Sequence, residues 1–262
     1  MQEQGIVPNQ PGSGPGGLSA NALKLIAIIA MLIDHIATVF LPYQSLPAVV
    51  MHFIGRITGP TMFFLVAEGY RHTRNVNRYT LRLAAFALVS YVPFIYCFTG
   101  ALPGPGSFLQ LNVIYTILLG LLAIRLRNEA GNIVVKIGGI LVLLVLATAG
   151  DWGVLGILIM LAFDYFHGDF KNQAVAYCFV ILCQGGLLSA LLYPAYCFLA
   201  QSPIDLAGIY GHYMSEMGMF IPIVLLHRYN GRRGNGGKFA KWGFYMFYPL
   251  HLLALGLIAH FI

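Results

Sequence analysis

Charge is scarce in this chain of 262 residues. Only 9% of the residues are charged, and the acidic side chains, Asp and Glu together, number 9. Hydrophobic residues make up 58% and the mean hydropathy is +0.76, values far from those of soluble globular proteins. A soluble fold with a charged surface is therefore excluded, and the composition indicates a protein that is largely embedded in lipid.

Cysteine and nucleic-acid motifs are equally sparse. The four cysteines, Cys97, Cys178, Cys183 and Cys197, lie in apolar segments without CxxC spacing, so we expect packing residues rather than a metal or redox site. No helix-turn-helix, zinc or RNA-binding pattern is present. The net charge of +6 then predicts affinity for anionic membrane lipid, and no nucleic-acid partner.

Long apolar segments dominate what is present. Because about 20 apolar residues cross a bilayer, the hydropathy predicts an all-α polytopic membrane protein with a single bundle of about nine transmembrane helices. The predicted spans are residues 20–41, 47–69, 79–98, 108–126, 132–149, 153–167, 173–199, 205–227 and 239–262.

The basic residues are sorted between the gaps that separate these spans. Fourteen of the 15 Lys and Arg residues lie in or beside the gaps on one side, and gaps such as 42–46 and 99–107 contain none. The positive-inside rule then predicts a cytoplasmic N-terminus and an external C-terminus, in the cytoplasmic (inner) membrane of a bacterium. Residues 1–18, rich in Pro, Gly and Gln, are predicted to be a disordered cytoplasmic tail without signal-peptide features, before one domain at 19–262.

Polar residues inside the spans are candidates for chemistry, because burial in lipid makes them costly. At a rise of about 1.5 Å per residue, several lie roughly 10–17 Å below the predicted outer end of their helices. This outer polar set comprises Asp34, His35, Arg56, His212 and His251, with Asn112 near an outer helix start. The convergence of these groups from five helices at one depth predicts a site in the outer half of the membrane.

Structural readings of the same residues stay open. Asp34 and Arg56 are natural partners in an ion pair between two helices, since neighbours i and i+1, such as Asp34 and His35, do not face each other. His35 alone fits a core histidine, and His251, beside Tyr248 and Pro249, fits a helix kink. His212 and Glu216 are one turn apart, but no third ligand follows, so we predict no metal site.

A second polar set lies in the gap after the second span. Its members are Glu68, Arg71, His72, Arg74, Arg78 and Arg82, with Lys24 and Asp164 as further candidates. These charges either obey the positive-inside rule alone or form a patch for phosphate, because the planar guanidinium suits phosphate oxygens.

Four blocks of the sequence resemble one family. LKLIAIIAMLIDHIATVF, IGRITGPTMFFLVAEGYRHTRNVNRYTLRLAAFALVSYVPF, LNVIYTILLGLLAI and KWGFYMFYPLHLL are similar to the TraX family of membrane proteins, from about residue 20 to the end. More distantly, a basic residue eleven positions before a His in the first helix, here Lys24 and His35, resembles the acyltransferase 3 superfamily. Lys24 replaces the Arg that is usual there, and only Arg82 clearly matches the basic pattern of the third helix.

The resemblance implies an acetyltransferase, since the founding TraX protein is associated with N-terminal acetylation of pilin. It implies cytoplasmic acetyl-CoA as the acyl donor, held by Lys24, Glu68 and the arginines of the inner set, and an acceptor outside. His35 would be the general base, with Asp34 and Arg56 beside it. Arg56, Asn112 or Tyr115 would stabilise the oxyanion, and His212, Tyr248 and His251 would contact the acceptor.

Other functions remain open. Intramembrane Asp, His and Arg residues also mark ion paths, so a proton-coupled transporter or a channel is an alternative, although no inverted repeat is visible. A non-catalytic assembly factor for surface polymers is a third possibility. The acceptor itself, a protein N-terminus or a glycan amine or hydroxyl, is not specified by the sequence.

Overall fold

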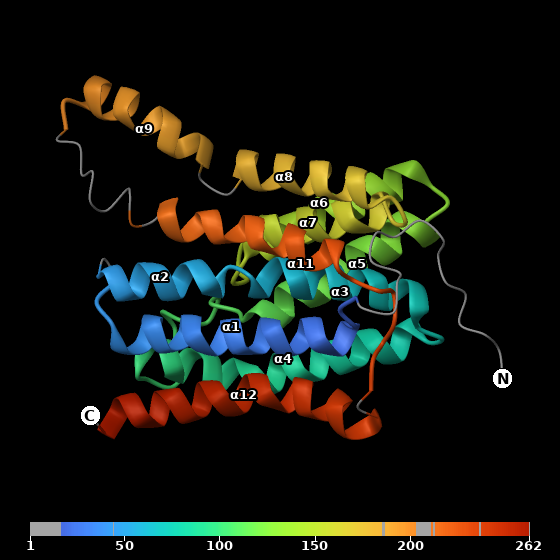
Figure 1. Cartoon of the computed structure of the whole chain (residues 1–262), viewed down its shortest axis with the longest axis horizontal. Helices are drawn as coiled ribbons and strands as arrows, with labels where there is room; N and C mark the ends of the chain where they lie inside the picture. The colour runs from blue at the N-terminus through green and yellow to red at the C-terminus, as the bar shows by residue number, and fades with distance from the viewer. Residues whose placement is uncertain are drawn as a thin grey trace.

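The computed structural model describes residues 17–43, 45–184, 187–202, 211, 213–235 and 237–261. Apart from two isolated bridges, Leu18 with Tyr229 and Leu111 with Gly150, the regular structure of these residues is helical. Figure 1 shows the helices lying side by side in one bundle. Four helical segments of the described residues are long and apolar enough to cross a membrane: Ala20–Phe40, Leu46–His72 (which holds two successive helices), Val76–Thr99 and Trp242–Phe261. The prediction of an α-helical membrane protein is confirmed at this level.

The helices follow the predicted spans closely at the start and end of the chain. Their bounds are α1 Ala20–Phe40, α2 Leu46–Gly55, α3 Thr58–His72, α4 Val76–Thr99, α5 Val113–Glu129, α6 Ile133–Ala147, α7 Gly153–Tyr165, α8 Phe170–Gln184, α9 Leu187–Ala200, η1 Met217–Phe220, α11 Ile221–His227 and α12 Gly237–Phe261. The predicted span 173–199 corresponds to two helices, α8 and α9, and the predicted span 205–227 is described only in part.

Short polar side chains set where the helices begin. Ser19, Ser45, Asn75, Asn112 and Asn132 each accept a hydrogen bond from the first turn of the following helix. Such caps satisfy amide groups that have no partner within the helix, and this matters most where water is excluded. The caps therefore explain why α5 begins at Val113 rather than at residue 108.

The predicted second span is broken in its middle. α2 ends at Gly55 and α3 begins at Thr58, so Arg56 and Ile57 lie at the junction. Pro60, in the first turn of α3, has no N–H to extend the α2 ladder. The Arg56 side chain at this junction is 25% exposed and half-buried in the bundle.

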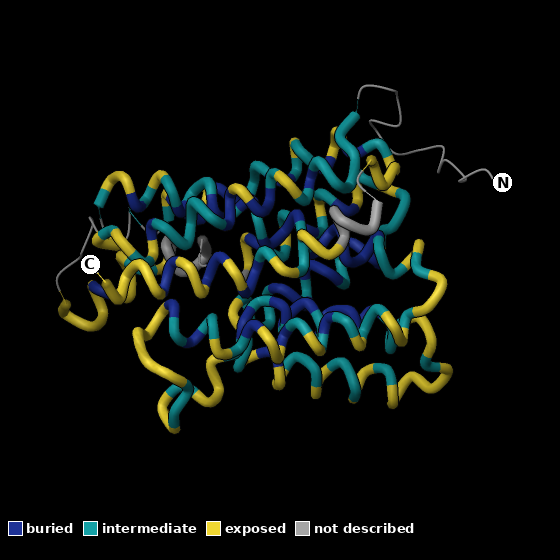
Figure 2. The backbone as a smooth tube through the Cα atoms, turned by 90° about the horizontal axis from the view of Figure 1, so that it is seen from below, coloured by how far each residue is buried: buried dark blue, intermediate teal, exposed yellow. Residues whose placement is uncertain are grey.

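Packing centres on α1, which contacts α2, α3 and α12, while α7 joins α3, α5 and α8. Figure 2 shows buried backbone along the middle of the bundle and exposed backbone at its margins. Exposed apolar residues such as Val134, Val142 and Val145 of α6 form an outward face suited to lipid.

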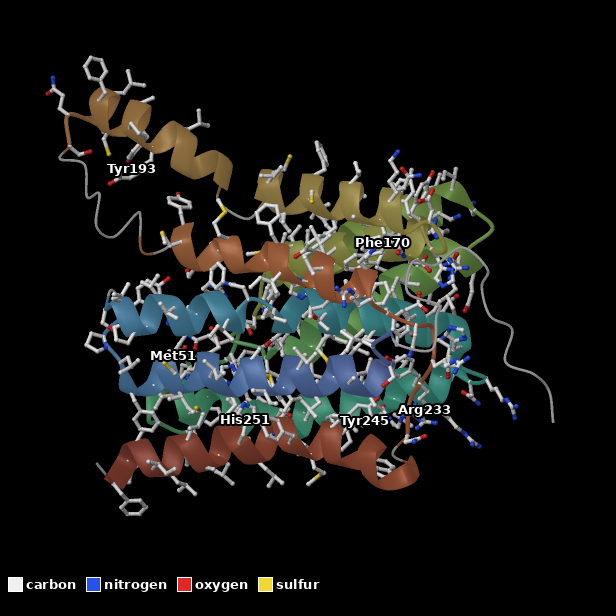
Figure 3. The ribbon with its side chains drawn as sticks, viewed as in Figure 1. Met51, Phe170, Tyr193, Arg233, Tyr245 and His251 are labelled. Carbon is white, nitrogen blue, oxygen red and sulfur yellow. The ribbon has the colours of Figure 1, made fainter. Side chains whose placement is uncertain are left out.

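Basic side chains gather at one end of the bundle, which we call the basic end. It comprises the start of α1, the α3–α4 junction, the end of α5 and the loop before α12. Nitrogen-rich side chains crowd this end in Figure 3, where Arg233 is labelled. The observed clustering agrees with the predicted sorting of Lys and Arg. The other end of the helices, around Met51 in the same view, is called the opposite end.

Candidate active site

A cavity of about 1170 Å³ runs between α1, α3, α4 and α12. It exceeds the roughly 300–1,000 Å³ typical of small-molecule pockets. Lys24, Arg74, Arg82, Arg232 and Arg233 line it toward the basic end, and Asp34, His35, Arg56, Asp151 and Trp152 line it toward the opposite end. Apolar groups such as Met31, Leu65 and Ile117 line the stretch between them. One cavity therefore joins the two polar sets that the sequence predicted separately.

The loop before α12 carries two of these cations across the start of α1. The amides of Leu18, Ala20 and Asn21 donate to the carbonyls of Arg228, Arg232 and Arg233 at 2.7, 2.9 and 3.1 Å. The Asn21 side chain adds a hydrogen bond to the Asn235 carbonyl at 2.8 Å. These contacts fix the loop on α1, so that Arg232 and Arg233 reach the cavity. Neither arginine was among the predicted site residues, because the contact joins opposite ends of the sequence.

The cations that line the cavity lack acidic partners. Arg74, Arg82, Arg232 and Arg233 form no ion pair with any carboxylate in the described residues. The Arg82 guanidinium lies 5.6 Å from the Tyr79 ring, and its Nε atom is buried without a hydrogen-bond partner in the described part of the chain. An unused buried donor of this kind suits an anionic ligand.

Two arginines of the second polar set, Arg71 and Arg78, do not line the cavity. Arg71 contacts Asp164 through Nη2 at 2.7 Å, and Arg127 contacts the other Asp164 oxygen, also at 2.7 Å. Asn128 donates to the same oxygen at 2.8 Å, and Asp164 has no exposed side-chain surface. This Asp164 cluster ties α3, α5 and α7 together.

Glu68 lines the cavity near its basic end. Its carboxylate lies 3.1 Å from His167 Nε2 and 3.5 Å from His72 Nε2. The side chain of Glu68 is 6% exposed, so two histidines rather than water surround most of it. Glu68 therefore contacts two histidines at the cavity wall, and His72 also lines the cavity.

His35 pairs with the histidine of the last helix. His35 Nδ1 lies 2.7 Å from His251 Nε2, and His251 Nδ1 lies 2.8 Å from the Phe247 carbonyl oxygen. Phe98 packs edge-on against the His35 ring at 5.4 Å. His35 lines the cavity, whereas His251 is 7% exposed and lies behind it. The sequence placed both histidines at one depth, but not in contact.

The predicted ion pair between Asp34 and Arg56 is wrong, because each group has another partner. Asp34 Oδ1 lies 2.9 Å from His52 Nδ1, and Arg56 Nη2 lies 2.8 Å from Glu216 Oε1. Gly55 makes the first contact possible, since any side chain there would collide with Asp34. Glu216 approaches Arg56 through the packing of η1 on α2, which residue spacing does not reveal.

Arg56 nevertheless faces the cavity. Its guanidinium lies 5.9 Å from the Trp152 ring, and its Nε atom is buried without a partner among the described residues. Trp152 in turn packs closely on Gly59, where a Cβ would overlap the indole. Arg56 is therefore held by Glu216 on one side and Trp152 on another, with one donor unused.

The other predicted contacts have structural partners or fall outside the description. Asn112 caps α5 and donates to the Ala87 carbonyl at 2.8 Å, and the Tyr115 hydroxyl donates to Leu146 at 3.1 Å. Neither residue lines the cavity, whereas Tyr248 does. His212 lies outside the described residues.

Asp151 lies in the turn between α6 and α7, and its side chain reaches the cavity. Partial loss of hydration at the cavity wall raises the pKa of the carboxyl to about 6, with Arg56 opposing the shift and Asp34 adding to it. No three His, Cys, Asp or Glu side chains gather as metal ligands in the described part of the chain. The cavity thus offers several cations and Glu68 at one end, and a histidine, an arginine and two carboxylates at the other.

Known proteins resemble almost the whole chain. A family model described as "TraX protein" matches residues 19–259. A relative from Dichelobacter nodosus, named "Probable fimbrial assembly protein FimC, serogroup H1", is 35% identical over 245 residues. The match covers 90% of this chain and 94% of that protein. No solved structure matches.

Proposed function

The chain belongs to the TraX family, and on that premise we propose that it is an integral membrane acetyltransferase. It would move an acetyl group from cytoplasmic acetyl-CoA to an amine or hydroxyl of an acceptor outside. The single observation that carries the proposal is the cavity, which connects arginines that form no ion pair within the described residues, at the basic end, to His35 near the opposite end. The basic end would face the cytoplasm, in keeping with the positive-inside rule.

The charged and apolar parts of the cavity follow one another in the same order as the phosphate and pantetheine parts of an acyl-CoA. Arg74, Arg82, Arg232 and Arg233 would hold the phosphates, since charge-assisted hydrogen bonds from Arg suit phosphate oxygens. The apolar middle would take the narrow pantetheine arm. Lys24 and His35 are eleven residues apart on α1, or about 16 Å along the helix. That distance supports the proposal, because it would let the thioester end of a donor reach His35.

His35 would act as general base and acid. It would take a proton from the acceptor X–H as X attacks the thioester carbonyl, and return that proton to the sulfur when the C–S bond breaks. The products are acetylated X and the free thiol of CoA, so atoms and charge balance. Arg56 is the oxyanion donor that the geometry favours, because its Nε atom is unused, whereas Asn112 and Tyr115 already donate to carbonyls.

The relative named as a fimbrial assembly protein points to a fimbrial subunit as the acceptor. The same name also supports a second function, a non-catalytic factor for fimbrial assembly. CoA binding distinguishes the two functions, because only the enzyme requires it.

The test uses purified protein, acetyl-CoA carrying an isotopic label, and membranes from the source cells. Wild-type protein should bind CoA, and mass spectrometry should find labelled acetyl groups on an acceptor. His35→Gln should reduce transfer by roughly 10²–10⁴-fold, the usual contribution of a general base, with little change in CoA affinity. His260→Gln is the matched control, because His260 is exposed on α12 and is not among the residues that line the cavity.

Absence of CoA binding by the wild-type protein would overturn the acetyltransferase and leave the assembly factor. Full transfer by His35→Gln would instead place the base elsewhere in the cavity.

A further inference from the structure

The two histidine rings share one in-plane hydrogen bond. The ring planes of His35 and His251 differ by 2°, and the ring centroids lie 5.0 Å apart. Parallel rings stacked face to face could not bring two of their nitrogens to the observed 2.7 Å. The rings therefore meet edge to edge, with Nδ1 of His35 pointing at Nε2 of His251. One of these nitrogens must carry the hydrogen and the other must accept it.

The carbonyl oxygen of Phe247, which bonds the other nitrogen of His251, decides which histidine donates. His251 Nδ1 lies 2.8 Å from the carbonyl oxygen of Phe247, which can only accept. His251 Nδ1 therefore carries a hydrogen, and in neutral His251 the Nε2 atom holds a lone pair. That lone pair accepts the hydrogen of His35 Nδ1. Neutral His35 is then left with its own lone pair on Nε2.

From this geometry we infer that His251 is a positioning residue, which fixes His35 as the Nδ1–H tautomer and leaves His35 Nε2 as the proton-accepting atom. The inference rests on the proposed function, because it assigns the atom of His35 that exchanges the proton. It also gives a role to a histidine that does not line the cavity.

The surroundings hold His251 in place. Phe247 packs almost parallel to the His251 ring at 4.7 Å, and Tyr248 packs edge-on at 5.6 Å. A side chain that is 7% exposed and bonded at both nitrogens has no freedom to turn. Its orientation is therefore imposed on His35, much as a carboxylate imposes the tautomer of histidine in a hydrolase triad.

His251 would also assist the proton transfer. When His35 Nε2 takes the proton of the acceptor, the ring becomes cationic and its Nδ1–H bond to His251 strengthens. When Nε2 gives that proton to the leaving sulfur, the bond relaxes to its starting state. His251 Nε2 neither gains nor loses a proton over the whole cycle.

The tautomer can be measured without any catalysis. Nitrogen NMR of purified protein labelled with ¹⁵N-histidine, at a pH where His35 is neutral, should show His35 protonated at Nδ1 and bare at Nε2. His35→Gln assigns the signal. In His251→Leu the His35 signal should move toward the other tautomer, whereas in His260→Leu, the control on the same helix, it should not move.

Kinetics provide the second readout. His251→Leu should lower kcat at least tenfold with unchanged CoA affinity, and His251→Gln should recover part of it, since its amide can donate to Phe247 and accept from His35. A wild-type His35 that carries its hydrogen on Nε2 would overturn the inference even if the protein transfers acetyl groups. The expected tautomer in a protein that neither binds CoA nor transfers acetyl would support the histidine pair and refute the enzyme. Should His251→Leu fail to fold, the wild-type spectrum and His251→Gln still decide.

Discussion

Two groups of arginines share the basic end of the molecule and differ in what surrounds them. Arg71 and Arg127 are held by the fully buried Asp164, which bonds both guanidinium groups and Asn128. Arg82 and Arg232 line the cavity without a carboxylate partner among the described residues. In the sequence all four are equivalent, as basic residues beside a predicted gap.

The difference shows that arginines which all fit the positive-inside pattern have two different roles in this chain. A buried carboxylate turns one pair of cations into a brace between α3, α5 and α7. Where no carboxylate is supplied, the charge is left for a ligand, and under the proposed function that ligand is the phosphate end of the donor. Stability and donor binding should therefore respond to different arginines.

The largest expected effect is the loss of the brace. Asp164→Asn would leave two partly buried guanidinium groups without their carboxylate. Breaking a buried pair in this way costs roughly 3–5 kcal/mol. We expect a marked fall in the thermal unfolding temperature in detergent, with CoA affinity nearly unchanged at temperatures where the variant is folded.

The control for the brace is Glu129→Gln. Glu129 pairs with Arg125 at 2.8 Å, but its side chain is 47% exposed. An exposed pair contributes at most about 1 kcal/mol, so this variant should melt close to the wild type. If Asp164→Asn melts no lower than Glu129→Gln, the Asp164 cluster does not stabilise the fold, and the two groups of arginines do not differ in the way described above.

The next effect concerns the arginines of the cavity. Arg82→Gln or Arg232→Gln should each remove a charge-assisted contact of roughly 1.5–3 kcal/mol, which corresponds to a loss of CoA affinity of about 10- to 150-fold. The unfolding temperature should stay near that of the wild type, because neither arginine has an acidic partner in the described part of the chain. Isothermal calorimetry at fixed low salt measures the affinity.

Arg78→Gln is the matched control, one turn before Arg82 on α4. Arg78 is exposed and does not line the cavity, so its replacement should barely change CoA affinity. Equal losses for Arg78 and Arg82 would mean that general positive charge, rather than the cavity, attracts the donor.

Sequence reasoning anticipated what depends on local pattern. The bounds of α1, α4 and α12 lie close to those predicted from apolar length, and Lys24 and His35 both line the cavity. The family resemblance was recognised from the same segments and is confirmed by the match over residues 19–259.

What sequence reasoning missed depends on contacts between distant segments. Arg232 joins the cavity only because the loop before α12 bonds to the start of α1. Glu216, rather than Asp34, meets Arg56 because η1 packs on α2 at the junction that interrupts the predicted span. Residue spacing within one helix carries no information on which of several carboxylates approaches from another.

The smallest expected effect concerns Asp151 at the opposite end of the bundle. Asp164 is held by two arginines, Arg71 and Arg127, whereas these two arginines do not contact Asp151. The pKa of Asp151 is raised to about 6 from a usual 3.8. Between these values the folded protein therefore binds more protons at this site than the unfolded chain, and stability falls as the pH rises.

Asp151→Asn removes that loss, so the variant should equal the wild type near pH 4 and exceed it slightly above pH 6. The gain should stay below about 1 kcal/mol, because the carboxylate reaches water in the cavity. Unfolding temperatures of the two proteins from pH 4 to 7.5 measure the difference, with Glu129→Gln as the reference for general acid effects. A difference that stays constant with pH would show that folding does not shift the pKa of Asp151. A gain of the variant over the wild type that grows toward low pH would show that Asp151 is paired in the folded protein, as Asp164 is.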